Sequence, residues 1–400
     1  MPDRYPRSSV VALSLFVFVA FGIELYAMSV LLTENAAGGD FSIGLLSLAF
    51  GGSVVIAGVA APRVGRWADH HSVRGITILG AVLGFCGLIL VGIAQVPWQV
   101  IGAFWLLLGP AQAMSLYEPA FVAVGLWVGD NHRNRAIALL TVIGGLAGPV
   151  FLPVTGYAVE HFGWRSTTIG YAIVLVVTGL VVALAFLPDD KPIVHRDAPI
   201  PKATWRRFVA DRRLGLQSLS VVLLFASMNS MLFHRVAIFE EQGFDVGFVA
   251  LLAGISGVLT FPGRYLAPRI AERIRPTTIL TLGVGGLVVA IVLAIVGSPE
   301  IVMIAYFVAF GLFFGFILPL RPVIMHGWYG GADYGSVMGK QWSAAAVAGG
   351  IAPTLIGVAR DALGSYTLPL VALVVATALA GVFNELSVSS YANDRAAARR

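Results

Sequence analysis

Three titratable side chains lie within long apolar stretches of the sequence, where an ionisable group is expensive to bury. They are Glu24, Glu118 and His234. A carboxyl in a low-dielectric cavity can exchange a proton near neutral pH, and an imidazole does so even when unperturbed. We therefore predict that these residues carry protons, with Glu24 as the first candidate and Glu118 as its rival. Alternatively, Glu24 is a satisfied residue near the outer interface, and His234 is simply hydrogen-bonded in place.

Three arginines in or close to the apolar stretches could bind an anion, because arginine presents a planar fork that meets a carboxylate through two hydrogen bonds. With nearby polar residues they form the predicted substrate-binding set, which is Tyr26, Gln112, Tyr117, Asn229, Arg235, Arg264 and Arg321. Two alternatives stay open. Arg264 could belong to the basic cluster that follows it, and Arg235 could neutralise Glu240 or Glu241.

Glu118 and Arg321 occupy matching places in a repeated pattern. Tyr-Glu-Pro at 117–119 returns as Leu-Arg-Pro at 320–322, and each triplet is followed by a tryptophan and a glycine. Proline bends a helix and frees a backbone carbonyl, which suits a gating segment. We predict that Glu118 and Arg321 pair across a cavity or line it together. The alternative is that each side chain reaches the membrane surface and only anchors its helix.

Patterns typical of enzymes are missing from the sequence. It contains no Gly-x-x-x-x-Gly-Lys-Ser/Thr loop for nucleotide phosphates, no spacing typical of metal ligands and no serine in a nucleophile elbow. We therefore predict that the chain is not an enzyme and needs no cofactor and no metal ion.

The segments that carry these residues are apolar enough to lie in a bilayer. Hydrophobic residues make up 58% of the 400 residues, and charged residues only 12%. A spanning helix needs about 20 apolar residues. Only helices satisfy the backbone of such segments in hydrocarbon. The sequence predicts an all-α membrane protein with twelve transmembrane helices near 9–32, 42–61, 75–95, 98–127, 136–158, 166–188, 214–238, 246–266, 277–297, 300–326, 337–359 and 366–388.

The chain is built twice. Ala-Pro-Arg-Val at 61–64 returns as Ala-Pro-Arg-Ile at 267–270, and the segment 156–163 returns at 357–364. Duplicated apolar halves are typical of transporters that alternate access to a central site. We predict two pseudo-symmetric six-helix bundles, 1–188 and 214–400, joined by a cytoplasmic linker at 189–213. The linker begins with prolines and ends in a basic amphipathic piece, which suggests a helix on an anionic leaflet, or else a solvated linker.

Positive charges set the orientation of the chain in the membrane. Of the 26 Lys and Arg, 20 fall in segments on the side of the N-terminus and only two on the other side. This bias predicts a multi-pass protein of the plasma (inner) membrane with both termini in the cytoplasm. It also explains the net charge of +5 without any nucleic-acid partner.

Two motifs resemble the major facilitator superfamily. Residues 65–74 read Gly-Arg-Trp-Ala-Asp-His-His-Ser-Val-Arg, similar to the loop between spans 2 and 3 of that family, and Gly144 to Pro149 resembles its Gly-x-x-x-Gly-Pro motif in span 5. The resemblance covers the whole chain. It implies a fold of six plus six helices, a cavity lined by spans 1, 4, 7 and 10, and a monomer.

The same resemblance implies gating residues. In the superfamily the loop carboxylate holds the cytoplasmic gate by facing a helix N-terminus and nearby basic residues. Here the matching residues are Asp69, Arg74, Arg133 and Arg135, with the start of span 11 near Gly335 as the facing terminus.

A narrower resemblance links Asn229, His234 and Arg264 to the monocarboxylate and oxalate–formate branch, whose span-8 arginine binds the substrate carboxylate. It implies a proton-coupled symporter of a small organic anion, such as a monocarboxylate, that works by alternating access. The alternative is a proton-driven efflux pump for drug-like compounds, which the span-5 motif favours. A transporter-like sensor or membrane enzyme is the remaining class, and no added domain supports it. The predicted partners are a small-molecule substrate, a proton and the lipid bilayer.

Overall fold

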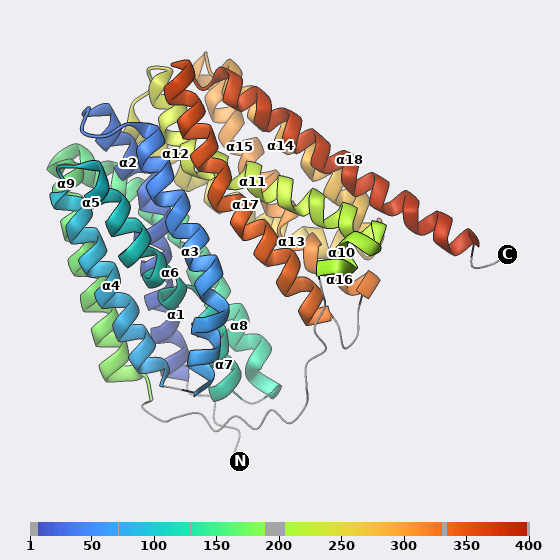
Figure 1. Cartoon of the computed structure of the whole chain (residues 1–400), viewed down its shortest axis with the longest axis horizontal. Helices are drawn as coiled ribbons and strands as arrows, with labels where there is room; N and C mark the ends of the chain where they lie inside the picture. Colours follow the sequence, from blue (N-terminus) through green and yellow to red (C-terminus); the bar gives the residue numbers. More distant parts are fainter. Residues whose placement is uncertain (1–6, 71, 129, 189–204, 330–333, 398–400) are drawn as a thin grey trace. The chain divides into compact units, whose positions relative to one another are not determined.

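The computed structural model describes residues 7–70, 72–128, 130–188, 205–329 and 334–397, and every regular element in them is a helix (Figure 1). The first half contains α1 (Arg7–Phe21), η1 (Gly22–Tyr26), α2 (Ala27–Ala37), α3 (Ile43–His70), α4 (Val73–Ile93), α5 (Pro97–Gly102), η2 (Ala103–Leu108), α6 (Gly109–Ser115), α7 (Tyr117–Trp127), α8 (Asp130–Gly145) and α9 (Ala147–Phe186). The second half contains α10 (Trp205–Ala210), α11 (Arg212–Glu241), α12 (Val246–Val258), α13 (Thr260–Ile270), α14 (Pro276–Val296), α15 (Glu300–Ile317), α16 (Leu320–Tyr329), α17 (Tyr334–Leu363) and α18 (Thr367–Ala397).

Twelve membrane spans follow from these helices. Eleven helical segments of the described chain are long and apolar enough to cross a bilayer, and one of them, Arg135–Phe186, has 52 residues. At 1.5 Å per residue it would measure about 78 Å, more than twice the hydrocarbon thickness. The chain folds back within it at Gly163, where φ is +74°. The contact between the hydroxyls of Thr155 and Tyr171, 2.8 Å apart, lies across this reversal and shows that the segment is two antiparallel spans.

The chain separates into two compact units. Unit 1 contains residues 1–196, 235–240 and 244–254, and unit 2 contains residues 197–234, 241–243 and 255–400. The predicted boundaries at 1–188, 189–213 and 214–400 stay a prediction, and residues 189–204 lie outside the described part of the chain.

The duplication is visible in the backbone of both halves. Gly39 after the first span and Gly243 after the seventh both have positive φ, at +76° and +90°. Gly163 and Gly364 close the fifth and eleventh spans with φ of +74° and +71°. These positions favour glycine because other residues pay a steric cost there. The turns therefore recur at the spacing that the sequence repeat predicts.

The helix pairs inside the units repeat as well. In unit 1, α4 packs on α9 and α3 packs on α6. In unit 2, the corresponding helices α14 and α13 pack on α18 and α15. Together with the recurring turns, these pairs confirm the predicted fold of two pseudo-symmetric bundles.

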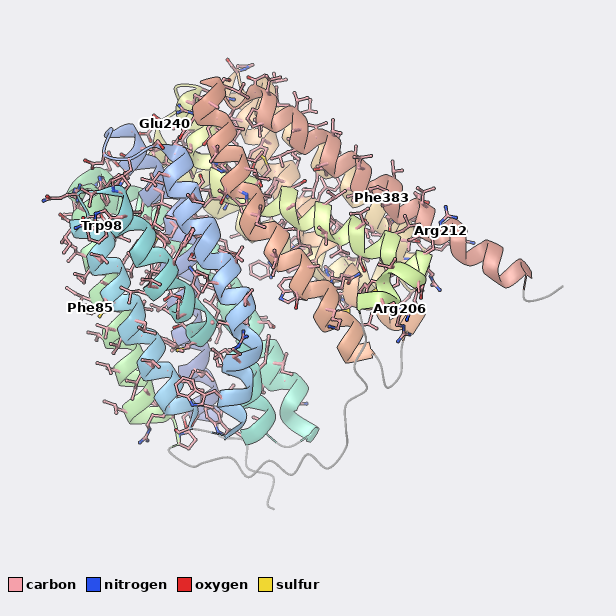
Figure 2. All side chains as sticks on the ribbon, viewed as in Figure 1. Phe85, Trp98, Arg206, Arg212, Glu240 and Phe383 are labelled. Atoms are coloured by element: carbon pink, nitrogen blue, oxygen red, sulfur yellow. The ribbon has the colours of Figure 1, made fainter. Side chains whose placement is uncertain are left out.

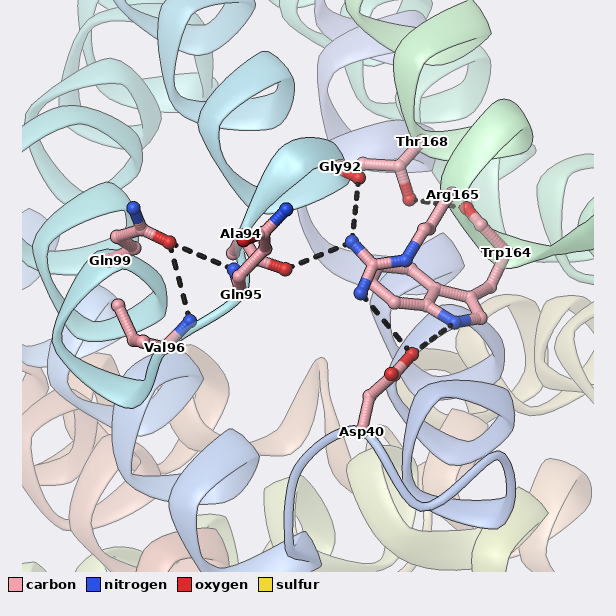
Figure 3. A network of polar contacts seen from close by, with 9 residues as sticks. All are labelled: Asp40, Gly92, Ala94, Gln95, Val96, Gln99, Trp164, Arg165 and Thr168. Carbon is pink, nitrogen blue, oxygen red and sulfur yellow. Dashed lines mark hydrogen bonds and ion pairs between the residues drawn. The ribbon is translucent and has the colours of Figure 1, made fainter.

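A polar staple holds one end of unit 1 (Figure 3). Arg165, which follows the Gly163 turn, donates hydrogen bonds to the carbonyls of Gly92 and Ala94 at 3.1 and 2.9 Å. Its other terminal nitrogen lies 3.4 Å from Asp40, which also accepts a hydrogen bond from Trp164 at 3.2 Å. The guanidinium thus satisfies carbonyls at the end of α4 that have no helical partner, and it joins three connections of the bundle.

The helices that carry the predicted site residues in unit 1 are irregular. The first span contains a π-helical turn at Gly22–Tyr26, and the fourth span contains another at Ala103–Leu108. The fourth span also breaks at Leu116, whose backbone is extended (φ −91°, ψ −156°). Single π-turns inside α-helices frequently mark functional sites. Glu24 lies in the first of these turns, and Gln112 and Tyr117 lie on either side of the break.

Candidate functional site

Glu24 is a buried carboxyl in the interior of unit 1. Its side chain is 1% exposed, and neither oxygen has a hydrogen-bond partner among the described residues. A Cβ added at Gly84 of α4 would lie 2.8 Å from Glu24 Oε1 and 2.6 Å from Leu175 of α9. The carboxyl therefore lies over a glycine, against the third and sixth spans. An unpaired carboxylate is very costly in such surroundings, so this carboxyl is far cheaper to bury with its proton than without it.

Gln112 ties the fourth span to the turn that carries Glu24. Its amide nitrogen donates to the backbone carbonyl of Glu24 and to the hydroxyl of Ser53, both at 3.3 Å. Gln112 is itself 1% exposed. The predicted residues Glu24 and Gln112 thus meet, but through the backbone of Glu24 and not through its carboxyl.

Two predicted substrate-binding tyrosines pack on the glycines of the span-5 motif. A Cβ at Gly144 would lie 2.5 Å from the Tyr117 hydroxyl oxygen, and a Cβ at Gly148 would lie 3.0 Å from the Tyr26 ring. Tyr117 also stacks on Phe121, with ring centroids 5.2 Å apart and an interplanar angle of 14°. The missing side chains of Gly144 and Gly148 thus make room for two aromatic rings.

More aromatic rings pack against one another in unit 1, and the sequence alone did not single them out. The ring centroid of Phe21 lies 4.5 Å from that of Tyr117. Phe151 contacts both Phe18 and Tyr171 edge to face, at 5.4 and 5.9 Å. Phenylalanine in a membrane helix is indistinguishable from ordinary packing in the sequence. In the sequence, only the glycines that pack against such rings could have indicated them.

In unit 2, Arg321 is held by α17. Its Nε donates to Gln341 Oε1 at 2.9 Å, and a terminal nitrogen donates to the carbonyl of Met338 at 2.7 Å. The guanidinium also lies 5.1 Å from the ring of Trp342, which is 40% exposed and contacts Phe225 of α11 edge to face. Gln341 and Trp342 join the site only in the structure, because nothing in their spacing distinguishes them from other residues of span 11.

His234 has both ring nitrogens occupied. Nε2 lies 2.8 Å from the carbonyl oxygen of Pro353, and Nδ1 lies 2.9 Å from the hydroxyl of Tyr366. A carbonyl can only accept, so Nε2 carries the proton and Nδ1 accepts from the tyrosine. The residue is 1% exposed. This arrangement fixes α11 against α17 and the start of α18.

The remaining substrate-binding candidates differ in their surroundings. Asn229 donates to the carbonyl of Phe225 in its own helix, at 2.8 Å. Arg235 is buried, at 2% exposure. Arg264 is half-buried with its guanidinium 5.7 Å from the ring of Phe261, and its buried Nε has no hydrogen-bond partner among the described residues.

Comparison with known proteins identifies the family. The family model described as Major Facilitator Superfamily matches residues 10–300. The chain belongs to the major facilitator superfamily. It is a transporter and not an enzyme. It is a multi-pass membrane protein that moves small molecules.

Individual relatives of this facilitator include a multidrug efflux pump and a multidrug resistance protein. The multidrug efflux pump Tap of Mycobacterium tuberculosis is 25% identical over 413 residues, which cover 95% of this chain and 93% of Tap. The multidrug resistance protein MdtG of Escherichia fergusonii is 25% identical over 65% of this chain and 64% of its own length. The crystal structure of the nucleoside transporter NupG has the same fold, with a TM-score of 0.79, 13% identity and coverage of 96% of this chain and 99% of NupG.

The gating residues that the superfamily motif implies are only partly described. Arg74 of the facilitator donates two hydrogen bonds to the carbonyl of Leu187, at 3.1 and 2.7 Å, and so ties the start of α4 to the end of α9. Arg135 is exposed. The side chains of Asp69, Glu118 and Arg133 lie outside the described part of the structure, so the predicted gate and the Glu118–Arg321 pair stay predictions.

Within the described residues of the facilitator, no group of three His, Cys, Asp or Glu side chains is placed to hold a metal ion.

Proposed function

We propose that this transporter exports amphipathic, drug-like organic compounds in exchange for protons, by alternating access. Protonation of Glu24 would couple substrate movement to the proton gradient. Tyr26 and Tyr117 would contribute aromatic surface to the substrate, and Gln112 would hold the turn that carries Glu24. His234 has the weakest case for proton transfer, since both its nitrogens are engaged within unit 2.

The observation that carries the proposal is the buried carboxyl of Glu24. It has no hydrogen-bond partner in the described chain and lies in a π-helical turn between two smooth helical segments. A structural carboxyl of this kind would be replaced at little cost by an apolar residue, whereas a proton carrier must be a group that can lose its proton. Coupling requires only that the turn expose the carboxyl to water in another state of the transport cycle.

The substrate class is supported by the aromatic surroundings of unit 1 and by the relatives. Drug-like sites are lined mainly by apolar and aromatic side chains with a few polar groups. Phe21, Tyr26, Tyr117 and Phe121 provide such a lining around the span-5 glycines. Tap is named as a multidrug efflux pump and MdtG as a multidrug resistance protein, and each matches this chain at 25% identity.

A second candidate is symport of a small organic anion, such as a monocarboxylate, with a proton. One observation favours it: the Nε–H of Arg264 is buried without a hydrogen-bond partner among the described residues, and a carboxylate oxygen would satisfy it. Arg321 supports this candidate less, because Gln341 and the carbonyl of Met338 already accept its hydrogen bonds.

We further propose that the protein lies in the plasma (inner) membrane as a monomer, with both termini in the cytoplasm. The distribution of lysine and arginine supports this orientation, since 20 of the 26 fall on the side of the N-terminus.

The test uses the full-length protein reconstituted in liposomes with an imposed pH gradient. Ethidium serves as the amphipathic probe and labelled lactate as the anionic one. We expect ethidium to move in the direction set by the pH gradient and to dissipate that gradient. Glu24→Gln should reduce this movement to the leak of protein-free liposomes, and Glu24→Asp should retain part of it.

Glu300→Gln is the matched control, because Glu300 is an exposed carboxyl in the first turn of α15. It should leave ethidium transport unchanged. Wild-type coupling in Glu24→Gln would remove Glu24 from the mechanism. Proton-driven lactate accumulation without ethidium movement would establish the second candidate instead.

A further inference from the structure

A rigid corner joins α10 to α11 in unit 2. Phe208 of α10 is buried in a cluster with Leu214, Met325 and Val337. Its carbonyl oxygen approaches Gly215 so closely that a Cβ there would lie 2.5 Å from it. The carboxylate of Asp211, between the two helices, accepts a hydrogen bond from the backbone of Leu214 at 3.0 Å. The direction of α10 is therefore fixed by packing and by a cap.

The arginines of this corner fall into two groups. Arg213 is 9% exposed, and its guanidinium lies over the ring of Trp328 at 3.6 Å. Arg206 and Arg212 are exposed, and Figure 2 labels both at the corner. Between them lies Val209, which is 86% exposed. The outer face of the corner thus presents the exposed side chain of Val209 with the exposed arginines Arg206 and Arg212 on either side of it in the sequence.

Val209 is highly exposed although it lies outside the membrane-spanning segments. Most of the other large apolar side chains with high exposure, such as Leu106 at 74%, lie in the candidate membrane spans, where lipid would cover them. Val209 lies outside every candidate span of the described chain. A valine this exposed next to a basic surface is typical of a helix that lies in the membrane interface.

A second segment of unit 2 has the same composition. Between α13 and α14, Arg273 and Arg275 are exposed on either side of Ile274, which is 47% exposed. Glu272 is the exposed acid in this segment. The pattern of an apolar residue between two arginines therefore occurs twice.

Both segments lie at the same end of unit 2. Hydrogen bonds from two neighbouring residues of α18 to the helices that follow these segments place them there. Ser387 of α18 donates to Gln217 of α11 at 3.0 Å, and Asn384, less than one turn away, donates to the carbonyl of Thr277 of α14 at 2.9 Å. At 1.5 Å per residue, Arg212 begins α11 about 8 Å beyond Gln217, and Arg275 precedes Thr277 by about 3 Å. Two basic segments thus flank one end of the bundle.

We propose that this end of unit 2 binds the headgroups of anionic phospholipids. Arg206, Arg212, Arg273 and Arg275 would meet lipid phosphates, and Val209 and Ile274 would enter the acyl boundary between them. Arginine matches phosphate geometry through paired hydrogen bonds, and an anionic leaflet supplies the opposite charge. None of the four guanidinium groups has a hydrogen-bond or ion-pair partner among the described residues. The proposal needs only that this end of unit 2 meets a leaflet, and it is independent of the substrate.

The test measures lipid retention by the intact protein. Full-length protein is purified from mixed micelles that contain equal amounts of phosphatidylglycerol and phosphatidylcholine, and the bound lipids are counted by native mass spectrometry. We expect wild-type protein to retain phosphatidylglycerol preferentially. Each arginine near an anionic surface contributes about a fivefold factor in affinity, so Arg206→Gln with Arg212→Gln should weaken retention about 25-fold.

The control variant removes two charges from unit 1, through Arg7→Gln with Arg63→Gln, both of which are exposed arginines. Equal loss of phosphatidylglycerol in the control and in the corner variant would overturn the proposal, because net charge alone would then account for retention. Stabilisation of the protein by inorganic phosphate to the same degree as by phosphatidylglycerol would also overturn it, since the site would then recognise a soluble anion.

A second variant tests the corner itself. Gly215→Ala keeps all four arginines but places a Cβ against the backbone of Phe208, so α10 must shift. Retention should fall although no charge is lost. Retention at the wild-type level in a folded Gly215→Ala protein would contradict a lipid site that depends on the position of α10.

Discussion

The two units hold their buried titratable groups in opposite ways. In unit 1, Glu24 lies in the bundle interior with no hydrogen-bond partner for either oxygen among the described residues. In unit 2, His234 is equally buried but uses one ring nitrogen on the carbonyl of Pro353 and the other on the hydroxyl of Tyr366. Both residues lie in the first span of their bundle.

The two arrangements suit different roles. The surroundings of Glu24 allow the carboxyl to change its charge, whereas the hydrogen bonds of His234 fix the positions of neighbouring helices. A carboxyl with no partner loses no hydrogen bond when it gains or loses a proton. The bonded imidazole could accept a second proton only if its hydrogen bond with the Tyr366 hydroxyl reversed direction. Equivalent spans of the two units thus hold an unpaired carboxyl in one case and a hydrogen-bonded joint between helices in the other.

The largest effect expected on stability comes from removing that joint. His234→Leu removes the buried hydrogen bonds that the imidazole makes with the carbonyl of Pro353 and with the hydroxyl of Tyr366. A lost buried hydrogen bond costs about 0.5–1.5 kcal/mol and a buried polar group with an unmet hydrogen bond about 1–3 kcal/mol, so the free energy of unfolding should fall by about 2–4 kcal/mol. Thermal or denaturant unfolding in detergent measures this change.

Glu24→Gln is the contrasting variant in the same assay, because the carboxyl has no partner to orphan. Its free energy of unfolding should stay within about 1 kcal/mol of wild type. Equal destabilisation by both substitutions would show that Glu24 is also a structural joint, and the contrast between the two units would fail.

A smaller effect is expected where a glycine faces an aromatic ring. A Cβ at Gly22 would lie 2.1 Å from the ring of Phe151, and a Cβ at Gly286 would lie 2.2 Å from the ring of Phe313. Overpacking of this kind costs about 1–3 kcal/mol. Gly22→Ala and Gly286→Ala should therefore destabilise the protein to a similar degree, as measured by unfolding in detergent.

These two variants separate packing from function. Gly22 begins the π-helical turn of Glu24, whereas Gly286 lies in α14 of unit 2. Gly22→Ala should reduce proton-driven ethidium transport, and Phe151→Leu in the same chain should restore part of it. Gly286→Ala should leave transport per folded molecule unchanged. A matching loss of transport in both variants would indicate a general effect of instability.

The sequence was sufficient for the fold but not for the partners of the polar residues. Apolar length and the repeat are properties of the chain itself, so they predicted twelve spans and paired bundles, and Gly163 and Gly364 occupy the repeated turns. The surroundings of Glu24 depend on the rotation of its helix, which the π-helical turn changes locally. The resemblance to the superfamily implies that span 1 lines a cavity, yet the carboxyl lies over Gly84 and Leu175. Likewise, the sequence could not indicate that Gln341 holds Arg321.

The smallest effects are expected at the exposed ends of the bundles, where both units carry an arginine staple. Arg165 donates to the carbonyls of Gly92 and Ala94 and pairs with Asp40. In unit 2, Arg360 lies before the Gly364 turn and pairs with Glu241 at 2.8 Å. Ion pairs that solvent still reaches contribute about 0–1 kcal/mol, whereas hydrogen bonds from a charged group to helix-end carbonyls add to this. Arg165→Gln should therefore lower the free energy of unfolding by about 1–2 kcal/mol, and Arg360→Gln by less than about 1 kcal/mol.

Salt should affect the contacts of Arg165 and Arg360 differently. Screening weakens ion pairs that solvent reaches much more than it weakens hydrogen bonds to carbonyls. In about 1 M sodium chloride, where the Debye length falls to about 3 Å, the effect of Arg360→Gln should nearly vanish and that of Arg165→Gln should largely persist. Equal salt sensitivity in the two variants would mean that Arg165 acts through Asp40 alone. The carbonyls at the end of α4 would then contribute nothing to the staple, and the two units would close their ends by the same ionic contact.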